Sequence, residues 1–220
     1  MTLPDSVTDK LKRILAQKSE RGGDACLRFD PGKLPFLIRE TFPGYESYAL
    51  EIGCGWGEFT RAMAAANPGR LTIAVEKKLA RVLSCGRSQK HEGLENIRYV
   101  ILDVAWFFAG IFADETFDAI TINFPDPWPK ARHHKHRFIS PEFAATLSKI
   151  ARPGCRLVFA TDNYPYTREA AETFEQSPLW KNTEGHYLAR GHIPGRPVSF
   201  FEQLHRNEGA PIYFLEYEKT

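Results

Sequence analysis

The feature that most constrains the fold of this chain is a regular series of short apolar segments, spaced about one strand–helix unit apart. Longer stretches with apolar residues at helical spacing separate them. The apolar segments are 47–52, 71–75, 97–102, 117–122 and 155–160, and the helix-like stretches between them include 58–66, 78–91 and 139–151. Strands that alternate with helices are typical of βαβ units. The pattern therefore predicts an α/β fold with a doubly wound, mostly parallel sheet.

The two ends of the chain depart from this pattern. Apolar residues at helical spacing predict an amphipathic helix over about 5–20, and a loop rich in glycine and proline follows it. Near the other end, 211–218 (PIYFLEYE) predicts a late strand, antiparallel and at an edge of the sheet. The sequence shows no internal repeat or linker. We expect one domain over 1–220, with an N-terminal helix and loop at 1–45 and a Rossmann-like core at 46–220.

Composition narrows the class of protein. The chain is 43% hydrophobic and 25% charged, as in ordinary globular proteins. No uncharged apolar run approaches the ~20 residues that span a bilayer, and the charged N-terminal residues argue against a signal peptide. The four cysteines lie far apart without a C-x-x-C pair, which favours a reducing, cytoplasmic setting without metal. With a net charge of only +2, any nucleic-acid contact must concentrate its positive charge on one surface.

Four acidic residues stand at or near the ends of the first four predicted strands. They are Glu51, Glu76, Asp103 and Asp126, which lie 25, 27 and 23 residues apart. In an open α/β sheet, ligands bind outside the carboxyl ends of the strands. Any one of these acids has a simpler explanation as a helix cap. Four acids at the same place in four successive strand–helix units favour a common ligand site.

A glycine-rich turn follows the first of these acids, with Gly53, Gly55 and Gly57 in alternate positions. Glycine lets the backbone turn tightly and approach a ligand closely. The third glycine comes one position too early for the dinucleotide fingerprint, and Glu58 would repel a pyrophosphate there. This spacing disfavours an NAD-dependent dehydrogenase. It resembles motif I of the class I S-adenosylmethionine-dependent methyltransferases, with Glu76 placed to accept hydrogen bonds from both ribose hydroxyls.

The loop after the fourth predicted strand, 123–130 (NFPDPWPK), holds three prolines within five residues. Proline fixes the backbone, so this loop has little freedom to lose on binding. Asp126 is held there beside the aromatic ring of Trp128. A turn-forming aspartate and a core tryptophan are the simpler alternative. The position at a strand end favours a functional role instead.

A basic run continues from this loop and combines cations with adjacent histidines. Its members are Lys130, Arg132, Lys135 and Arg137 together with His133, His134 and His136. A solvated helix start is one reading. A metal site is a poor one, because the histidines are adjacent and lack a matching carboxylate pattern. We interpret the run as a phosphate-contacting surface beside the loop, where histidine and tryptophan add stacking capacity for unpaired bases.

Taken together, these segments resemble a known family. The loop 123–130, the following Ala-Arg-His-His-Lys, the glycine turn, and the segments 160–162 (ATD) and 197–202 (PVSFFE) are similar to the bacterial tRNA (guanine-N7)-methyltransferases of the TrmB family. The resemblance covers residue 47 to the C-terminus. It implies a Rossmann-like fold, S-adenosylmethionine as cofactor, and methylation of N7 of guanosine 46 in the variable loop of tRNA.

The resemblance also implies roles for individual residues. Those implied to bind the cofactor are Glu51, Gly53, Gly55, Gly57, Glu76, Asp103 and Asp126. Those implied to contact the guanine or its tRNA are Lys130, Asp162, Ser199, Phe200, Phe201 and Glu202. Ser199 stands where the family usually has threonine, and Leu204 lies near a usual arginine. These departures bear on affinity for tRNA more than on the chemistry.

Guanine N7 already carries an in-plane lone pair, so methyl transfer needs positioning rather than a strong base. We expect Asp126 to be the catalytic residue, orienting the base through its N–H edge and offsetting the positive charge that develops on the purine. Two alternatives remain open. One is an amino-methyltransferase that acts on adenine, whose loop has adjacent prolines where Asp126 separates them here. The other is a non-catalytic tRNA-binding protein.

Overall fold

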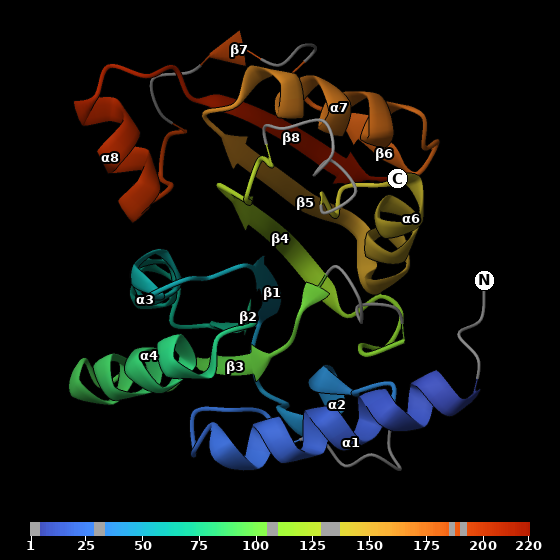
Figure 1. Cartoon of the computed structure of the whole chain (residues 1–220), viewed down its shortest axis with the longest axis vertical. Helices are drawn as coiled ribbons and strands as arrows, with labels where there is room; N and C mark the ends of the chain where they lie inside the picture. Colours follow the sequence, from blue (N-terminus) through green and yellow to red (C-terminus); the bar gives the residue numbers. More distant parts are fainter. Residues whose placement is uncertain (1–4, 29–33, 105–109, 129–136, 185–187, 190–192) are drawn as a thin grey trace.

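The computed structural model of the 220-residue chain describes residues 5–28, 34–104, 110–128, 137–184, 188–189 and 193–220. Its described strands form one sheet in the order β3-β2-β1-β4-β5-β8-β6, with β7 paired to β8 (Figure 1). The strands are β1 (Ser47–Ile52), β2 (Arg70–Glu76), β3 (Ile97–Ile101), β4 (Phe117–Asn123), β5 (Ala151–Thr161), β6 (Trp180–Asn182), β7 (Leu188–Ala189) and β8 (Tyr213–Lys219). The helices are α1 (Asp5–Arg21), α2 (Ile38–Thr41), α3 (Glu58–Ala66), α4 (Leu79–His91), α6 (Pro141–Ile150), α7 (Tyr164–Glu175) and α8 (Phe200–Asn207).

The pairing of the strands confirms the predicted α/β fold. The strands β3, β2, β1, β4 and β5 all run parallel to one another. The late strand β8 is antiparallel to β5, as expected, but its predicted place at an edge is wrong, because β6 pairs with its other side. Buried residues on consecutive positions, including Phe214, Leu215 and Tyr217, suit a strand that is covered on both faces.

Helices cover both faces of the sheet (Figure 1). Side chains alternate between the two faces of a strand, and β2 shows this directly. Leu71, Ile73 and Val75 join the large cluster that also takes in residues of α6 and α7. Ala74, between them, joins a second cluster with residues of α3 and α4. Because both faces are buried, the strands carry nearly continuous apolar runs, which made them recognisable in the sequence. Among the described residues, no helix has the length and apolar character needed to cross a membrane.

The point where the chain changes direction across the sheet lies beside β1. The chain passes from β1 to β2 and β3 on one side and returns to β4 on the other. Connections that leave in opposite directions open a crevice at the carboxyl ends of the two central strands. The glycine turn follows β1 and the proline-rich loop follows β4, so both border this crevice.

At the opposite end of the central strands, partly exposed charged side chains gather around Asp118 of β4. Its carboxylate accepts a hydrogen bond from the backbone N–H of Tyr48 at 2.8 Å and from Arg39 of α2 at 2.5 Å. Arg152 lies 3.2 Å from the other oxygen. These contacts tie α2, β1, β4 and β5 together at the end of the sheet away from the crevice.

Candidate active site

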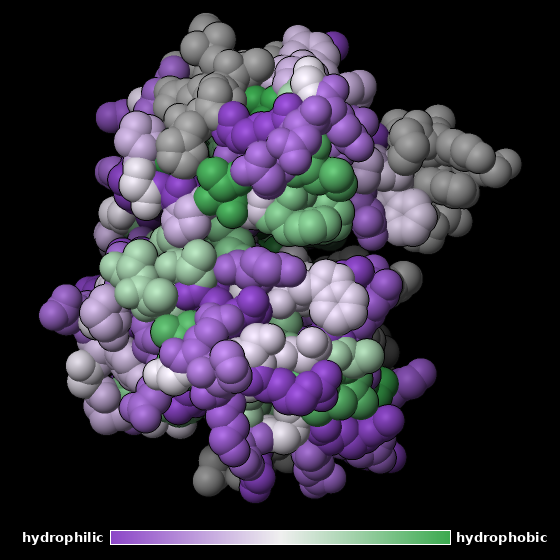
Figure 2. All heavy atoms as spheres, turned by 90° about the vertical axis from the view of Figure 1, so that its left-hand side faces the viewer, coloured by the Kyte–Doolittle hydropathy of each residue, from purple (hydrophilic) through white to green (hydrophobic). Residues whose placement is uncertain are grey.

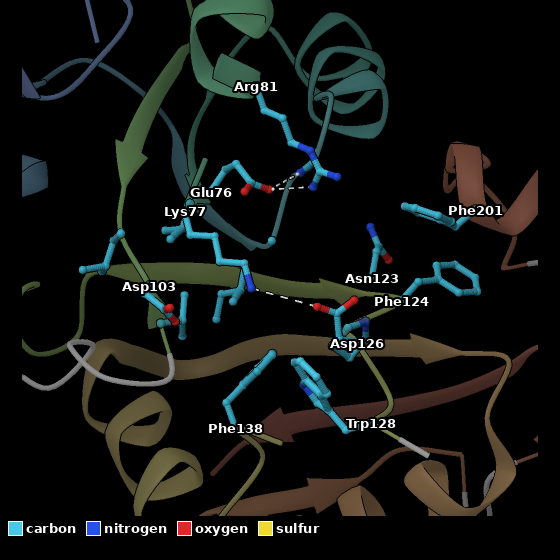
Figure 3. A pocket seen from close by; sticks show the side chains of 17 residues that line it. Glu76, Lys77, Arg81, Asp103, Asn123, Phe124, Asp126, Trp128, Phe138 and Phe201 are labelled. Carbon is cyan, nitrogen blue, oxygen red and sulfur yellow. Dashed lines mark hydrogen bonds and ion pairs between the residues drawn. The ribbon is translucent and has the colours of Figure 1, made fainter. Parts of the chain in front are cut away.

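A cavity of about 250 Å³ occupies the crevice at the switch point. Its wall combines the glycine turn, the ends of β2 and β3, the proline-rich loop and one residue of α8 (Figure 3). Lining residues from these five places include Gly53, Gly55, Glu76, Asp103, Asp126 and Phe201. The structure thus brings three of the four strand-end acids to one cavity.

The glycine turn divides into a part that lines the cavity and a part that packs behind it. Gly53 and Gly55 have φ of 81° and 60°, a left-handed conformation that favours glycine, and a Cβ on either would meet only open space. Gly57 precedes α3 and is not among the cavity residues. A Cβ there would come within 2.9 Å of the sulfur of Cys85. Its role is therefore close packing of the turn.

Glu76 is a buried carboxylate that is already oriented before any ligand arrives. One oxygen accepts a hydrogen bond from the backbone N–H of Gly55 at 3.2 Å. The other accepts one from the backbone N–H of Lys78 at 2.9 Å. Nη1 of Arg81 lies 3.4 Å from the first oxygen (Figure 3). These contacts join the end of β2 to the glycine turn. They leave the carboxylate in the cavity wall, where its remaining lone pairs suit hydroxyl donors.

Glu51 lies elsewhere than its position in the sequence implied. It is 3% exposed and is not among the residues that line the cavity. Its carboxylate accepts a hydrogen bond from the hydroxyl of Thr60 at 2.5 Å. Burial raises the pKa of Glu51 from 4.5 to about 7, against the opposing effects of Thr60 and of the positive charge of Arg196. Glu51 therefore supports the glycine turn from behind.

Asp126 is the exposed acid of the site. Its side chain is 73% exposed, and Lys77 at the end of β2 lies 4.0 Å from one carboxylate oxygen across the cavity (Figure 3). The loop around it is strained at both ends, because Phe124 and Trp128 have φ of 45° and 43°. Bulky residues rarely adopt this conformation, and such strain concentrates at functional sites. The loop thus presents Asp126 to the cavity in a fixed place.

Arg137 holds that loop rather than contacting a phosphate. Its Nε donates to the backbone carbonyl of Pro127 at 2.7 Å, and its Nη1 pairs with Glu169 of α7. The side chain is 4% exposed and lies over the ring of Tyr166. The prediction of a phosphate contact is wrong for Arg137, because the guanidinium is buried and satisfied inside the protein. The other members of the basic run, 130–136, lie outside the described residues.

The C-terminal segment separates into anchoring and exposed residues. Ser199 caps α8 by accepting from the backbone N–H of Glu202 at 3.2 Å. Glu202 is fully buried, and its carboxylate lies 2.6 Å from both Arg196 and Arg206. Neither residue is among those that line the cavity, so a direct guanine contact does not follow from this arrangement. Phe200 and Phe201, by contrast, are 56% and 43% exposed.

Phe201 reaches the cavity and lies against Phe124, with ring centroids 6.3 Å apart. Asp162, at the end of β5, is not among the cavity residues, and His205 of α8 lies 3.7 Å from its carboxylate. The ring of His205 stacks on that of Phe124 at 5.6 Å. The end of β5, α8 and the proline-rich loop therefore form one continuous margin of the cavity.

Sequence reasoning missed two residues of this margin. Asn123 ends β4 and lines the cavity, which its place at a strand end could have indicated. Arg196 donates to the side-chain oxygen of Asn123 from 73 residues further along the chain. No local pattern reveals a partner at that distance. Among the described residues, no group of three or more histidine, cysteine, aspartate or glutamate side chains is arranged to hold a metal ion.

Comparisons with known proteins agree with this geometry. A family model described as a putative methyltransferase matches residues 46–215. Two solved structures share the fold, at TM-scores of 0.62 and 0.56. They are a 16S rRNA methyltransferase, KamB, 17% identical over 83% of this chain and 92% of that one, and an S-adenosylmethionine-dependent methyltransferase from Aquifex aeolicus, 14% identical over 97% and 98%.

Similarity to curated relatives is closer. The tRNA (guanine-N(7)-)-methyltransferase of Leptospira interrogans is 35% identical over 78% of both chains. That of Nitrosomonas europaea is 35% identical over 87% of this chain and 83% of its own length. These identities exceed what a common fold alone would give, and the residues that the family model matches include the glycine turn and the proline-rich loop. The chain belongs to the tRNA (guanine-N(7)-)-methyltransferase family.

Proposed function

We propose that this chain transfers the methyl group of S-adenosylmethionine to N7 of guanosine 46 in the variable loop of tRNA. The observation that carries the proposal is the shared cavity of Glu76, Asp103 and Asp126 beside the glycine turn, in a chain of this family. Relatives named for guanine-N(7) supply the target atom. Position 46 extends the proposal to one nucleotide and rests on the resemblance of the loop and C-terminal segments.

The cavity residues fit the cofactor. S-adenosylmethionine supplies an electrophilic methyl group on a sulfonium centre. Gly53 and Gly55 leave open space where side chains would project, which admits a ligand close to the backbone. Glu76 and Asp103 both line the cavity, with Asp103 across it from the proline-rich loop (Figure 3). In the proposed complex Glu76 accepts from the paired hydroxyls of the ribose and Asp103 from the adenine amino group. Gly57 and Glu51 act indirectly by shaping the turn.

Asp126 has the exposure that a substrate contact requires. In the proposed reaction it accepts from the N–H edge of guanine and so directs N7 toward the methyl group. Its charge also offsets the positive charge that develops on the purine. In the structure Lys77 lies 4.0 Å from the carboxylate of Asp126. In the proposed complex the guanine replaces Lys77 as the partner of that carboxylate. No general base is required, since the lone pair of N7 is already available.

The exposed aromatic residues of α8 suit an RNA partner. Phe200 and Phe201 project from the helix beside the cavity, where unpaired bases stack on aromatic faces. The face of the molecule that carries α8, α3 and α4 is mostly hydrophilic, with hydrophobic side chains gathered across its middle (Figure 2). We retain Lys130 and Asp162 as proposed tRNA contacts. We assign Ser199 and Glu202 to the anchoring of α8.

The proposed function is tested by incubating the purified protein with tRNA and methyl-labelled S-adenosylmethionine and mapping the labelled nucleotide. Label on N7 of guanosine 46 is expected, and a transcript with adenosine at that position serves as the control. Label on an adenine amino group would favour an amino-methyltransferase. Cofactor binding without any transfer to tRNA would favour a non-catalytic tRNA-binding protein.

We also propose that 1–220 form one methyltransferase unit that works in the cytoplasm. Leu15 of α1 packs in the same hydrophobic cluster as residues of the central strands, which supports treating 1–45 as part of the unit. The four cysteines are buried, free thiols, which fits a reducing compartment. Fractionation of cells followed by immunodetection tests the location.

A further inference from the structure

We propose that Arg196 is a positioning residue for methyl transfer, which fixes Asn123 in the cavity wall and, through Glu202, fixes α8 and Phe201 at its margin. This inference rests on the proposed function for the reaction that it serves. The contacts that support it are all between residues of the protein and involve neither cofactor nor tRNA.

Arg196 is a buried cation with partners in four elements of the fold. Its Nη1 donates to Oε2 of Glu202 at 2.6 Å, and its Nη2 donates to Oδ1 of Asn123. The guanidinium lies 4.6 Å from the ring centre of Phe59 in α3 and 5.3 Å from that of Phe214 in β8. The planar fork of arginine can hold two acceptors at a fixed angle, which a lysine ammonium cannot. The side chain therefore sets the relative positions of β4 and α8.

Burying the Arg196 guanidinium is an unfavourable way to stabilise the fold if it serves no other purpose. The Arg196 side chain is 7% exposed, and among the described residues its Nε has no hydrogen-bond partner. Burial lowers the pKa of Arg196, and the charge of Glu202 opposes that effect. Replacing a buried ion pair by apolar residues is often neutral or stabilising, so burial of this pair is weak evidence for a purely structural role. A fixed geometry is the better explanation.

The attachment of α8 depends on this pair. Glu202 is the buried residue of the helix, while Phe200, Phe201 and Leu204 are exposed. In Figure 1 the helix stands apart from the layers that cover the sheet. The partners of this buried carboxylate therefore help to hold the helix, beside the contacts of Phe201 and His205 with Phe124. Arg206 lies on the same helix, so of these two arginines Arg196 is the one that joins Glu202 to another part of the fold.

Asn123 connects Arg196 to the wall of the cavity. It is the last residue of β4 and lines the cavity directly before the strained residue Phe124 (Figure 3). Phe124 in turn lies against Phe201 and His205 of α8. Arg196 thus holds the first residue of the loop that presents Asp126 and the helix that borders it. A small displacement of either would move Asp126 relative to its proposed substrate.

The test is a double-mutant cycle on the full chain with the variants Arg196→Lys and Asn123→Ala. Single-turnover methylation is measured at saturating tRNA and S-adenosylmethionine, with calorimetric titration of the cofactor alone beside it. We expect Arg196→Lys to slow transfer by about tenfold or more, because small misplacements of reacting groups are costly. In the Asn123→Ala background the same change should cost less than about threefold, the mark of residues that act together.

Arg206→Gln is the matched control. It removes the other cationic partner of Glu202 but leaves the bond to Asn123, so the rate should stay within about threefold of wild type. Thermal unfolding establishes that each variant is folded at the assay temperature. If Arg196→Lys does not fold, Asn123→Ala alone tests the same link from the cavity side and should reproduce the tenfold loss.

Equal losses from Arg196→Lys in both backgrounds, an unchanged rate, or an equal loss in Arg206→Gln would overturn the proposal. Failure of the proposed function is visible separately, because it would appear in the wild-type protein as absence of label on guanosine 46. In that case the double-mutant cycle uses the dissociation constants for S-adenosylmethionine in place of the rates of transfer. The proposal then requires that Arg196→Lys and Asn123→Ala be non-additive in cofactor binding, and additive values would overturn it.

Discussion

Replacement of Glu51 by glutamine should change the way in which stability depends on pH. The pKa of this carboxyl is raised from 4.5 to about 7, chiefly by burial. Between these two pH values the folded protein retains a proton that the unfolded chain has released. Stability therefore falls as pH rises from about 4.5 to about 7 and loses no more above that. Glutamine has nearly the same shape and no charge, so it removes this dependence.

The expected magnitude follows from the size of the change in pKa. Each tenfold change in a protonation constant is worth about 1.4 kcal/mol, so the rise from 4.5 to about 7 corresponds to about 3 kcal/mol. The variant Glu51→Gln should be within about 1 kcal/mol of wild type at pH 5, where the buried carboxyl is neutral. At pH 8 it should be more stable than wild type by about 3 kcal/mol, because the wild-type protein must then bury a charge.

Urea denaturation at pH 5 and pH 8 measures this difference directly, provided that each transition is two-state. Glu95→Gln, at an exposed carboxyl, is the matched control and should show no comparable change with pH. A Glu51→Gln variant whose stability relative to wild type is the same at both pH values would refute the reasoning. Such a result would mean that Arg196 compensates the ionised carboxylate in full.

Three further predictions concern the cavity and its support. Glu76→Gln should weaken S-adenosylmethionine binding by about ten- to a hundredfold without changing affinity for tRNA, since charged hydrogen bonds of this kind contribute about 1.5–3 kcal/mol. If calorimetry showed wild-type affinity for the cofactor in this variant, Glu76 would not belong to the binding site. Asp126→Asn should fold normally yet slow single-turnover transfer by about a hundredfold, and a rate within a few-fold of wild type would leave Asp126 only a loop-shaping role. Arg137→Lys should slow transfer while the slope of log affinity for tRNA against log salt stays unchanged; a slope smaller by about one would show that this residue meets a phosphate after all.

The parts of the fold that could be predicted from the sequence are those that local pattern determines. Apolar runs located the parallel strands to within a few residues, because strands buried on both faces are apolar along their length. The carboxyl ends of parallel strands meet at one edge, so strand-end positions placed Glu76, Asp103 and Asp126 in one cavity. The antiparallel direction of β8 was also predictable, but its partner β6 (Trp180–Asn182) is too short to leave a pattern.

The parts that could not be predicted depend on the direction of side chains and on distant partners. Glu51 is the last residue but one of β1, whereas Glu76 is the last residue of β2. Glu51 is buried behind the glycine turn, where its carboxylate accepts a hydrogen bond from Thr60. Arg137 was expected to contact a phosphate because it ends a basic run, and the family resemblance implied a guanine contact for Glu202. Both are buried, since their partners come from elsewhere in the fold: Glu169 for the one and Arg196 for the other. Local composition reports the average exposure of a segment, and an individual ion pair departs from it.

Three buried contacts show how the site is organised for a reaction that needs no general base. Glu76 holds the backbone of Gly55, Arg137 holds the carbonyl of Pro127, and Arg196 holds the side chain of Asn123. Glu76 belongs to the cavity wall itself, whereas Arg137 and Arg196 act on other segments of the wall from behind it. The groups left exposed at the cavity include Asp126, Lys77 and Phe201 of α8. Since the nucleophile in the proposed reaction is already present, acceleration must come from placing N7 in line with the methyl group. Loss of any one of the three contacts should therefore lower the rate of transfer at saturating substrate more than it alters the pH at which transfer is fastest.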